Sequence, residues 1–338
     1  MVNVNAKKSL LYFVLMNTIW LLAALSFSGC RATVARGPIH TLQSEEYVIH
    51  RIQKGETPEG LAERFLKDRN KAWVIEQANP GLLLREKSLI TIPLKDRNKG
   101  GIYKDEYQVV PILCYHQFGF DSRSSLNMPP GLFDRQMAFL KDNGYRTISL
   151  GQLVDFLEYK SSIPKQAILI TIDDGYRNTY DQAYPILKKY GFKAILCVYG
   201  DFVNASKNAV TWGQLKEMMA DGFEVASHTL SHANLTKKEP GEDDDAYVSR
   251  IQRELAGSKA LLEERLGRKI LAMTYPYGAY NETVVTLCEE AGYKLGFTVK
   301  PADNPFFTNP FLLGRNQILK RDFSYFKSKI NTRKRVPL

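Results

Sequence analysis

Two adjacent aspartates, Asp173 and Asp174, stand at the end of an apolar run, residues 168–172, and are followed at once by Gly175. Short apolar runs rich in β-branched residues are typical of buried strands. Two like charges at a strand end repel each other and lose hydration, so a nearby positive charge must stabilise them. A divalent metal would supply that charge. One aspartate could bind it, and the other could accept a proton from a water that the metal activates.

Histidines follow two other apolar runs. His228 and His232 lie four residues apart in SHTLSH, and His116 ends the run at residues 109–115. Two histidines at this spacing can face one ion if the segment forms a helical turn. Together with one carboxylate they suit a divalent metal with open positions, zinc above all. The alternative is a set of structural histidines, but the chain has only 5 histidines and three of them fall at such strand ends.

Strand-like and helix-like segments alternate from residue 109 onward. Several of the expected helices end in Gly, the usual stop signal. Dense alternation of this kind predicts an α/β fold, and we predict a distorted (β/α)7 barrel with its active site at the carboxyl ends of the strands. The expected strands are residues 109–116, 146–150, 167–173, 193–200, 223–229, 271–278 and 294–299.

The segments TIDDG, SHTLSH and YPYG resemble the first three motifs of the polysaccharide deacetylases, the NodB-homology domain of carbohydrate esterase family 4. The resemblance covers roughly residues 111–318. It implies a seven-stranded distorted barrel that removes acetyl groups from N-acetylated, occasionally O-acetylated, sugars. By position it also implies that Asp173 is the general base and that the backbone N–H of Tyr277 stabilises the oxyanion. The metal ligands it implies are Asp174, His228 and His232.

The chain departs from the family pattern at two places. Thr274 stands where an Arg normally pairs with the catalytic aspartate, and no histidine follows His232 to act as the acid. Exported deacetylases of poly-β-1,6-N-acetylglucosamine are similar in having an early acid histidine, and ILCYHQF gives that role to His116. Arg315, in GRNQI, either replaces the missing Arg or makes a surface or substrate-side contact.

The substrate stays open at this point. Poly-β-1,6-N-acetylglucosamine is favoured by His116 and Thr274, peptidoglycan is the alternative, and an O-acetyl esterase or a glycan-binding protein are further possibilities. A pure binding protein is disfavoured because the expected base, acid and metal ligands occur together. Trp212, Tyr275 and Tyr277 could stack on sugar faces at the rim of the site, although core packing explains Trp212 equally well.

Residues 47–95 form a separate pattern of strand, helix, helix and strand, a βααβ unit. It resembles the LysM module, which recognises chains containing N-acetylglucosamine. The matching residues are Tyr47, Gly55, Glu56, Thr57, and residues 61–62, 78–80 and 89–93. The resemblance implies glycan binding, including peptidoglycan, and the alternative is a spacer that has lost the binding. Residues 31–46 and 96–108 are predicted linkers, and residues 109–320 the deacetylase domain.

The first 30 residues carry a predicted export signal. Lys7 and Lys8 precede an apolar run at residues 10–27 that ends in small residues. SFSGC resembles a bacterial lipobox, which implies that Cys30 is lipidated and anchors an exported lipoprotein to a membrane of the bacterial cell envelope. An uncleaved membrane anchor is the alternative. Both place the rest of the chain outside the cytoplasm.

The remaining cysteines and the charge add two expectations. We predict that Cys114, Cys197 and Cys288 are small buried hydrophobic residues rather than disulfides. The net charge is +10, and residues 320–335 hold seven basic residues and one acid. We predict a solvated basic tail at residues 321–338, with contact to anionic lipid or wall polymer as the alternative. No nucleic-acid motif accompanies this charge, so no nucleic-acid partner is predicted.

Overall fold

The structure is a computed structural model that describes residues 41–81, 86–121, 124–319 and 322–336. The chain divides into two compact units, Met1–Leu94 and Lys95–Leu338. The predicted export signal, Cys30 included, lies outside the described residues. Of the helices in the described ranges, none combines the length and the apolar character needed to cross a membrane.

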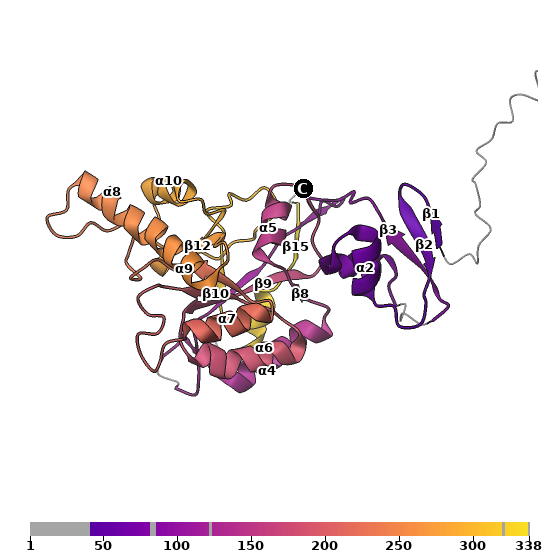
Figure 1. The fold of residues 1–338 in the computed structure, drawn as a ribbon, viewed down its shortest axis with the longest axis horizontal. Coiled ribbons are helices and arrows are strands. Elements are labelled where there is room, and N and C mark those ends of the chain that lie inside the picture. The colour runs from indigo at the N-terminus through magenta and orange to yellow at the C-terminus, as the bar shows by residue number, and fades with distance from the viewer. Residues whose placement is uncertain (1–40, 82–85, 122–123, 320–321, 337–338) are drawn as a thin grey trace, which may run out of the picture. The chain divides into compact units, whose positions relative to one another are not determined.

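The smaller unit packs its helices against a three-stranded antiparallel sheet of order β1-β2-β3 (Figure 1). Thr57 begins the first helix because its side chain accepts a hydrogen bond from the N–H of Gly60. The side chain of Asn79 ties the second helix to β3, donating to the carbonyl of Ile75 and accepting from the N–H of Thr91. The elements are β1 (Thr41–Gln43), β2 (Tyr47–Arg51), α2 (Pro58–Leu66), η1 (Arg69–Lys71), α3 (Ala72–Ala78) and β3 (Leu89–Pro93).

Strand β1 differs from the sequence prediction. Residues 41–43 lie in the range that we predicted as a linker, yet they pair with β2 from Thr41 opposite His50 to Gln43 opposite Val48. The pairing adds an antiparallel edge to β2, whose Val48 and His50 are buried in the core of the unit. A segment of three residues carries too little periodicity to be recognised as a strand from its sequence.

The larger unit is an α/β structure built around a parallel half-barrel sheet (Figure 1). The path of the sheet is β13-β12-β11-β10-β9-β5-β14, and β8 pairs with β9 beside this path. Its two edges meet at a single bridge between Phe297 and Leu313. The predicted (β/α)7 barrel is therefore present as a half-barrel, because β13 and the segment before β14 share an isolated bridge and a few backbone hydrogen bonds rather than a continuous ladder.

The elements of the larger unit follow the predicted alternation of strands and helices. They are β4 (Glu106–Gln108), β5 (Ile112–Tyr115), β6 (Gln117–Phe118), β7 (Asn127–Met128), α4 (Pro130–Asp142), β8 (Arg146–Thr147), α5 (Leu150–Leu157), β9 (Ala167–Asp174), η2 (Thr179–Ala183), α6 (Tyr184–Tyr190), β10 (Ile195–Val198), α7 (Trp212–Ala220), β11 (Glu224–Ser227), α8 (Asp244–Gln252), η3 (Arg253–Gly257), α9 (Ser258–Leu266), β12 (Ala272–Thr274), η4 (Pro276–Gly278), α10 (Glu282–Glu290), β13 (Leu295–Phe297), β14 (Asn316–Gln317), α11 (Phe323–Ser328) and β15 (Arg333–Arg335).

The alternation of side chains along β9 divides the core into two layers. Ile168, Ile170 and Ile172 belong to the larger cluster, which includes side chains of α4, α6, α7, α9 and α10. Leu169 belongs to a second cluster with residues of α5 and of the neighbouring strands. Because successive strand residues face opposite sides, Asp173 shares the face of Leu169, inside the half-barrel.

The described part of the C-terminal segment, residues 322–336, contains α11 and β15, so the prediction of a solvated tail is wrong for these residues. Phe326, in α11, is fully buried and makes an edge contact with Phe139 of α4. Strand β15 pairs with β4, which itself falls in the predicted linker at residues 96–108. The prediction rests on the many basic residues of the segment and does not take into account that Phe326 among them is buried.

The three cysteines in the described part of the chain are buried and free, as predicted. Burial raises the pKa of the Cys114 and Cys197 thiols well above their usual range, because the apolar interior disfavours the thiolate.

Candidate active site

The Asp173 carboxylate forms a buried ion pair with Arg315. The two terminal nitrogens of Arg315 donate to Oδ1 and Oδ2 of Asp173 at 2.7 and 2.8 Å. Arg315 is fully buried and also donates to the carbonyl oxygen of Thr298 and to the hydroxyl of Thr171. The guanidinium therefore pairs with Asp173 in the interior, which agrees with the first of the two roles considered for Arg315 and not with a surface contact.

Strand order explains how residues far apart in the chain meet. Arg315 directly precedes β14, which pairs with β5, and β5 pairs with β9, which ends in Asp173 and Asp174. Burial opposes ionisation of Asp173, but the charge and hydrogen bonds of Arg315 outweigh it and lower the pKa of Asp173 to about 2. This carboxylate is therefore ionised at neutral pH.

Asp174, His228 and His232 form a cluster whose ligand atoms all lie within 4.8 Å of one another. Oδ1 of Asp174 is 3.6 Å from Nε2 of His228 and 3.4 Å from Nε2 of His232. Tetrahedral zinc with Zn–N bonds of about 2.0–2.1 Å separates its ligand atoms by about 3.4 Å. The three side chains therefore fit a divalent metal. Burial would raise the pKa of Asp174, but the two imidazoles outweigh it and hold this pKa well below its usual range.

The second nitrogen of each imidazole is already engaged. Nδ1 of His228 lies 2.7 Å from the carbonyl oxygen of Thr274, and Nδ1 of His232 lies 3.2 Å from the hydroxyl of Tyr277. A carbonyl oxygen can only accept, so Nδ1 of His228 carries the proton and Nε2 is free to bind a metal. Thr274 thus orients a candidate metal ligand through its backbone.

The helical turn expected between His228 and His232 is absent. The segment instead bends, with positive φ angles of 70° at Thr229 and 63° at His232. The N–H of His232 donates to the hydroxyl of Thr229, and Glu254 accepts from the N–H groups of residues 230 and 231. The two imidazoles still meet, with ring centroids 4.7 Å apart. The bend at residues 230–231 therefore brings the two imidazoles together without a helical turn.

A second cluster, Cys114, His116 and Asp173, also brings three ligand atoms within 4.8 Å. It does not suit a metal cation. The Arg315 guanidinium already engages both oxygens of Asp173, and its positive charge would repel the ion. The Cys114 thiol is protonated and donates to Oδ2 of Asp173 at 3.5 Å. The two clusters therefore differ in kind: one fits a metal, and the other holds an ionised carboxylate beside an imidazole.

His116 lies directly after β5 and faces this carboxylate. Its Nε2 is 3.9 Å from Oδ2 of Asp173, and its Nδ1 is buried without a hydrogen-bond partner in the described part of the chain. Burial lowers the pKa of His116, although Asp173 and Asp174 oppose the shift. A lowered pKa makes the protonated imidazole a stronger acid. As expected from the sequence, His116 stands at the end of a strand, and the fold brings it next to Asp173.

The three aromatic residues expected at the rim have different surroundings. Tyr277 is 65% exposed, in a turn where its φ is 60°. Tyr275 is fully buried and donates to the carbonyl of Phe311, so the prediction that it contacts sugar is wrong. Trp212 is half-buried in the first turn of α7 and packs against the main core.

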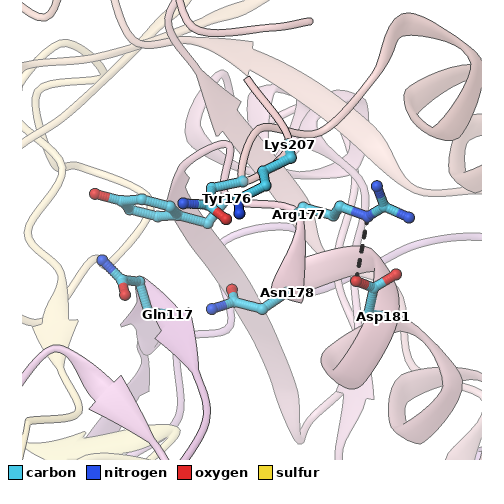
Figure 2. Close-up of a pocket in the computed structure, with 7 residues that line it drawn as sticks. Gln117, Tyr176, Arg177, Asn178, Asp181 and Lys207 are labelled. Atoms are coloured by element: carbon cyan, nitrogen blue, oxygen red, sulfur yellow. Dashed lines mark ion pairs between the residues drawn. The ribbon is translucent and has the colours of Figure 1, made fainter. Parts of the chain in front are cut away.

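A cleft of about 570 Å³ lies beside the candidate metal site. Gln117 in its lining directly follows His116, and the pKa of the Tyr176 hydroxyl is raised by burial and by the nearby carboxylate of Asp174. Figure 2 shows Gln117 and Tyr176 at one end and the ion pair of Arg177 with Asp181 at the other. We call it the Arg177 cleft. It is lined by Gln117, Tyr176, Arg177, Asn178, Asp181, Lys207 and Asn208. Sequence reasoning missed these residues, and their only signal was that three of them directly follow Gly175.

The chain is similar to known polysaccharide deacetylases. The family model described as polysaccharide deacetylase matches residues 160–296. The matched range includes both aspartates, His228, His232 and Tyr277. His116 and Arg315 lie outside it, so their assignment depends on the geometry of the folded chain.

Two relatives and one solved structure illustrate the similarity. YxkH of Bacillus subtilis, which carries a polysaccharide deacetylase name, is 34% identical over 217 residues, 64% of this chain and 74% of that protein. The poly-β-1,6-N-acetyl-D-glucosamine N-deacetylase of Staphylococcus aureus is 27% identical over 191 residues, 54% of this chain and 66% of that enzyme. The Streptococcus pyogenes deacetylase PplD, solved with acetate, has a TM-score of 0.60 and 29% identity, covering 66% of this chain and 98% of that one.

The chain therefore belongs to the polysaccharide deacetylase family. As a member it is a hydrolase that acts on amide bonds.

Proposed function

We propose that the protein removes acetyl groups from N-acetylglucosamine residues of an exported polysaccharide, with zinc as the divalent metal. The observation that carries the proposal is the juxtaposition of two sites on adjacent residues. Asp174 faces the two histidines at 3.6 and 3.4 Å, while Asp173 is held ionised by Arg315. When bound, the metal activates water for attack and polarises the acetamide carbonyl.

Four residues of the chain have roles in this proposal. Asp173 accepts the proton that the attacking water loses, and Arg315 keeps this carboxylate fixed and ionised. The backbone N–H of Tyr277 donates to the oxygen of the acetamide as negative charge develops there, a contribution typically worth about 3 kcal/mol per donor. His116, protonated, delivers a proton to the departing sugar amine, which is otherwise a very poor leaving group.

Poly-β-1,6-N-acetylglucosamine is the first candidate substrate. It is supported by the early position of His116 in the chain and by the pairing of Arg315 with Asp173 in place of an Arg at Thr274. The similarity to the staphylococcal enzyme, which is named for this polymer, adds to that support.

Peptidoglycan is the second candidate, favoured by the smaller unit. We propose that residues 47–95 are a LysM-like module that binds chains containing N-acetylglucosamine. Retention of the purified smaller unit on insoluble peptidoglycan would support this proposal, and passage through it without delay would leave the unit as a spacer.

We also propose that Cys30 carries lipid, which would anchor an exported lipoprotein to a membrane of the bacterial cell envelope. The support is the SFSGC sequence after an apolar run. Replacement of Cys30 by Ala is expected to move the protein from the membrane fraction to the soluble fraction of the envelope. Retention of that variant in the membrane fraction would instead point to an uncleaved anchor.

The deacetylase proposal is tested by measuring amine release from β-1,6-linked N-acetylglucosamine oligomers and from peptidoglycan. Asp173→Asn and His116→Ala are each expected to abolish release. Release from the oligomers alone would support the first candidate, and release from peptidoglycan alone the second. A His116→Ala variant with nearly full activity would point to an O-acetyl substrate, whose alkoxide needs an acid less. Bound zinc without release from either polymer would point to a binding protein.

A further inference from the structure

Two residues that line the Arg177 cleft follow residues of the candidate active site closely in the chain. Gln117 directly follows His116, and Tyr176 lies two residues after Asp174. A polymer whose acetamide sits at the metal site must continue beyond it, and a sugar next to the reacting one would enter this cleft. The volume of about 570 Å³ lies in the range of about 300–1,000 Å³ that is usual for small-molecule pockets, so it can accommodate that sugar.

Backbone contacts hold two segments of the cleft side by side. The N–H of Arg177 donates to the carbonyl of Asn208 at 2.7 Å, and the N–H of Val210 donates to that of Gly175 at 2.9 Å. Tyr176 and Ala209 form a β-bridge between these contacts. Lys207, next to Asn208, is thereby kept close to Arg177 by main-chain hydrogen bonds rather than by the conformations of mobile side chains.

The charge of the cleft is positive. Nε of Arg177 lies 3.4 Å from Oδ2 of Asp181 (Figure 2), and the opposite charges of these two side chains sum to zero. Lys207 is exposed and has no ion pair in the described ranges of the chain, so one positive charge remains uncompensated. The terminal nitrogens of Arg177 also have no hydrogen bond within those ranges. Together, these two side chains present several free donors towards one ligand.

The rest of the lining suits a sugar. Gln117, Asn178 and Asn208 supply amide groups, and Tyr176 supplies an aromatic ring. Oδ1 of Asn178 is buried and has no hydrogen-bond partner among the described residues. A buried acceptor without a partner loses the hydration that it would have in the open chain, and a hydroxyl of a bound sugar would restore a hydrogen bond to it.

We propose that the Arg177 cleft binds a sugar that carries a carboxylate, next to the N-acetylated sugar at the metal site, with Lys207 and Arg177 holding the carboxylate. The inference rests on the proposed deacetylase function. A neighbouring glucosamine, already deacetylated, carries an ammonium group that the same side chains repel. In this respect the cleft favours a polymer in which N-acetylglucosamine alternates with a sugar that carries a free carboxylate, rather than the homopolymer named above as the first candidate substrate.

The test compares two oligosaccharides that differ in one group. Both contain N-acetylglucosamine, and the adjacent sugar carries either a free carboxylate or its methyl ester. Binding to the full-length protein is measured by calorimetry, and amine release gives kcat/KM. Wild type is expected to prefer the acid by about tenfold in both readouts, the size of one charge-assisted hydrogen bond. Lys207→Met is expected to lose this preference, so that it binds and hydrolyses the acid and the ester equally well, and Arg177→Gln is expected to weaken the preference.

Lys165→Met is the matched control. Lys165 is an exposed lysine that precedes β9, at the opposite end of the strand from Asp173, and its removal should leave the preference intact. Equal binding of acid and ester by wild type, or no binding of either, would overturn the inference. Preferential binding of the acid without amine release from either sugar would contradict the proposed function and leave the carboxylate subsite standing.

Discussion

Asp173 and Asp174 are neighbours in the chain, but their carboxylates have different partners. Asp173 is nearly fully buried inside the half-barrel and is paired with Arg315. Asp174 has a φ of 75° and turns its carboxylate towards His228 and His232. Asp173 is stabilised by the guanidinium of Arg315, whereas Asp174 is suited to a bound metal ion. In the proposed reaction, this difference would let one carboxylate act as the base and the other as a metal ligand.

Removal of the guanidinium should reveal how strongly Asp173 depends on it. Arg315→Met leaves a buried carboxylate without a partner, which is expected to lower the free energy of unfolding by about 3–5 kcal/mol near neutral pH and to abolish activity. The measurement is urea unfolding of the metal-free protein. Arg315→Lys keeps the charge but not the two parallel hydrogen bonds, so its free energy of unfolding should lie between those of wild type and Arg315→Met.

The same pair gives a pH dependence with a defined sign. The folded pKa of Asp173, about 2, lies below the unfolded value of about 3.9, so its stabilising contribution is complete above about pH 4 and is lost as the pH falls through about 2. The difference in unfolding free energy between wild type and Arg315→Met should therefore narrow as the pH falls from about 4 towards 2. A constant difference across this window would show that the pair does not account for the stability.

The hydroxyl of Tyr277 should tune the candidate metal ligand His232. It lies 3.2 Å from Nδ1, and such outer contacts are worth about 10–100-fold in metal affinity. Tyr277→Phe keeps the backbone N–H and is expected to weaken zinc binding by about tenfold, measured by competition with a coloured chelator. Tyr280→Phe is the control, because its hydroxyl contacts Lys300 instead. Equal zinc affinity in both variants would contradict the role of the Tyr277 hydroxyl.

At the scale of elements, the site is made by the turns that end parallel strands. Four residues in these turns other than glycine have positive φ angles: Asp174, Thr229, His232 and Tyr277. Each such conformation costs about 1–2 kcal/mol for a residue with a Cβ atom. Strands β9, β11 and β12, held in one sheet, fix the starting points of these turns, so the strained conformations persist and direct the side chains to one place.

Gly278, directly after Tyr277, tests this dependence on turn geometry. Its φ is 69°, and an added Cβ atom would lie 2.3 Å from Cγ2 and 2.9 Å from the backbone nitrogen of Val299. Gly278→Ala is expected to destabilise the protein by about 2–4 kcal/mol and to reduce amine release by displacing the Tyr277 N–H. Calorimetric unfolding and initial rates are the measurements.

Gly213→Ala provides the matched comparison. This glycine lies in α7, and its added Cβ atom would meet nothing closer than 3.9 Å. Alanine is favoured over glycine inside helices, so this variant should be as stable as wild type or slightly more stable. Similar losses in both glycine variants would argue against a specific role for the turn at Gly278.

At the scale of the whole molecule, the larger unit depends on both ends of its chain segment. Strand β4 near its start pairs with β15 near its end, and Phe326 of α11 is fully buried. Phe326→Ala should lower the free energy of unfolding by about 3–5 kcal/mol, measured with urea. Phe307→Ala, at a side chain that is 64% exposed, should change it little. A minor loss in Phe326→Ala would mean that the C-terminal segment is dispensable for the fold.

The sequence alone determined the local features. Apolar runs marked the strands, glycines marked the helix ends, and residue types with fixed spacing marked Asp173, Asp174, His228 and His232. These signals are readable because strand and helix periods act over a few residues. The resemblance to a family further singled out His116 and Tyr277. It also offered Arg315 as a candidate, without deciding between two roles.

Only the tertiary structure decided the contacts between distant segments. Arg315 meets Asp173, 142 residues away, because β14, β5 and β9 are adjacent in the sheet. Tyr275 is buried and Phe326 packs into the core, although the sequence suggested a rim and a solvated tail. The Arg177 cleft exists because a bridge brings residues 208–210 to residues 175–177. Strand order and burial are set by the free energy of the whole fold, which no local pattern contains.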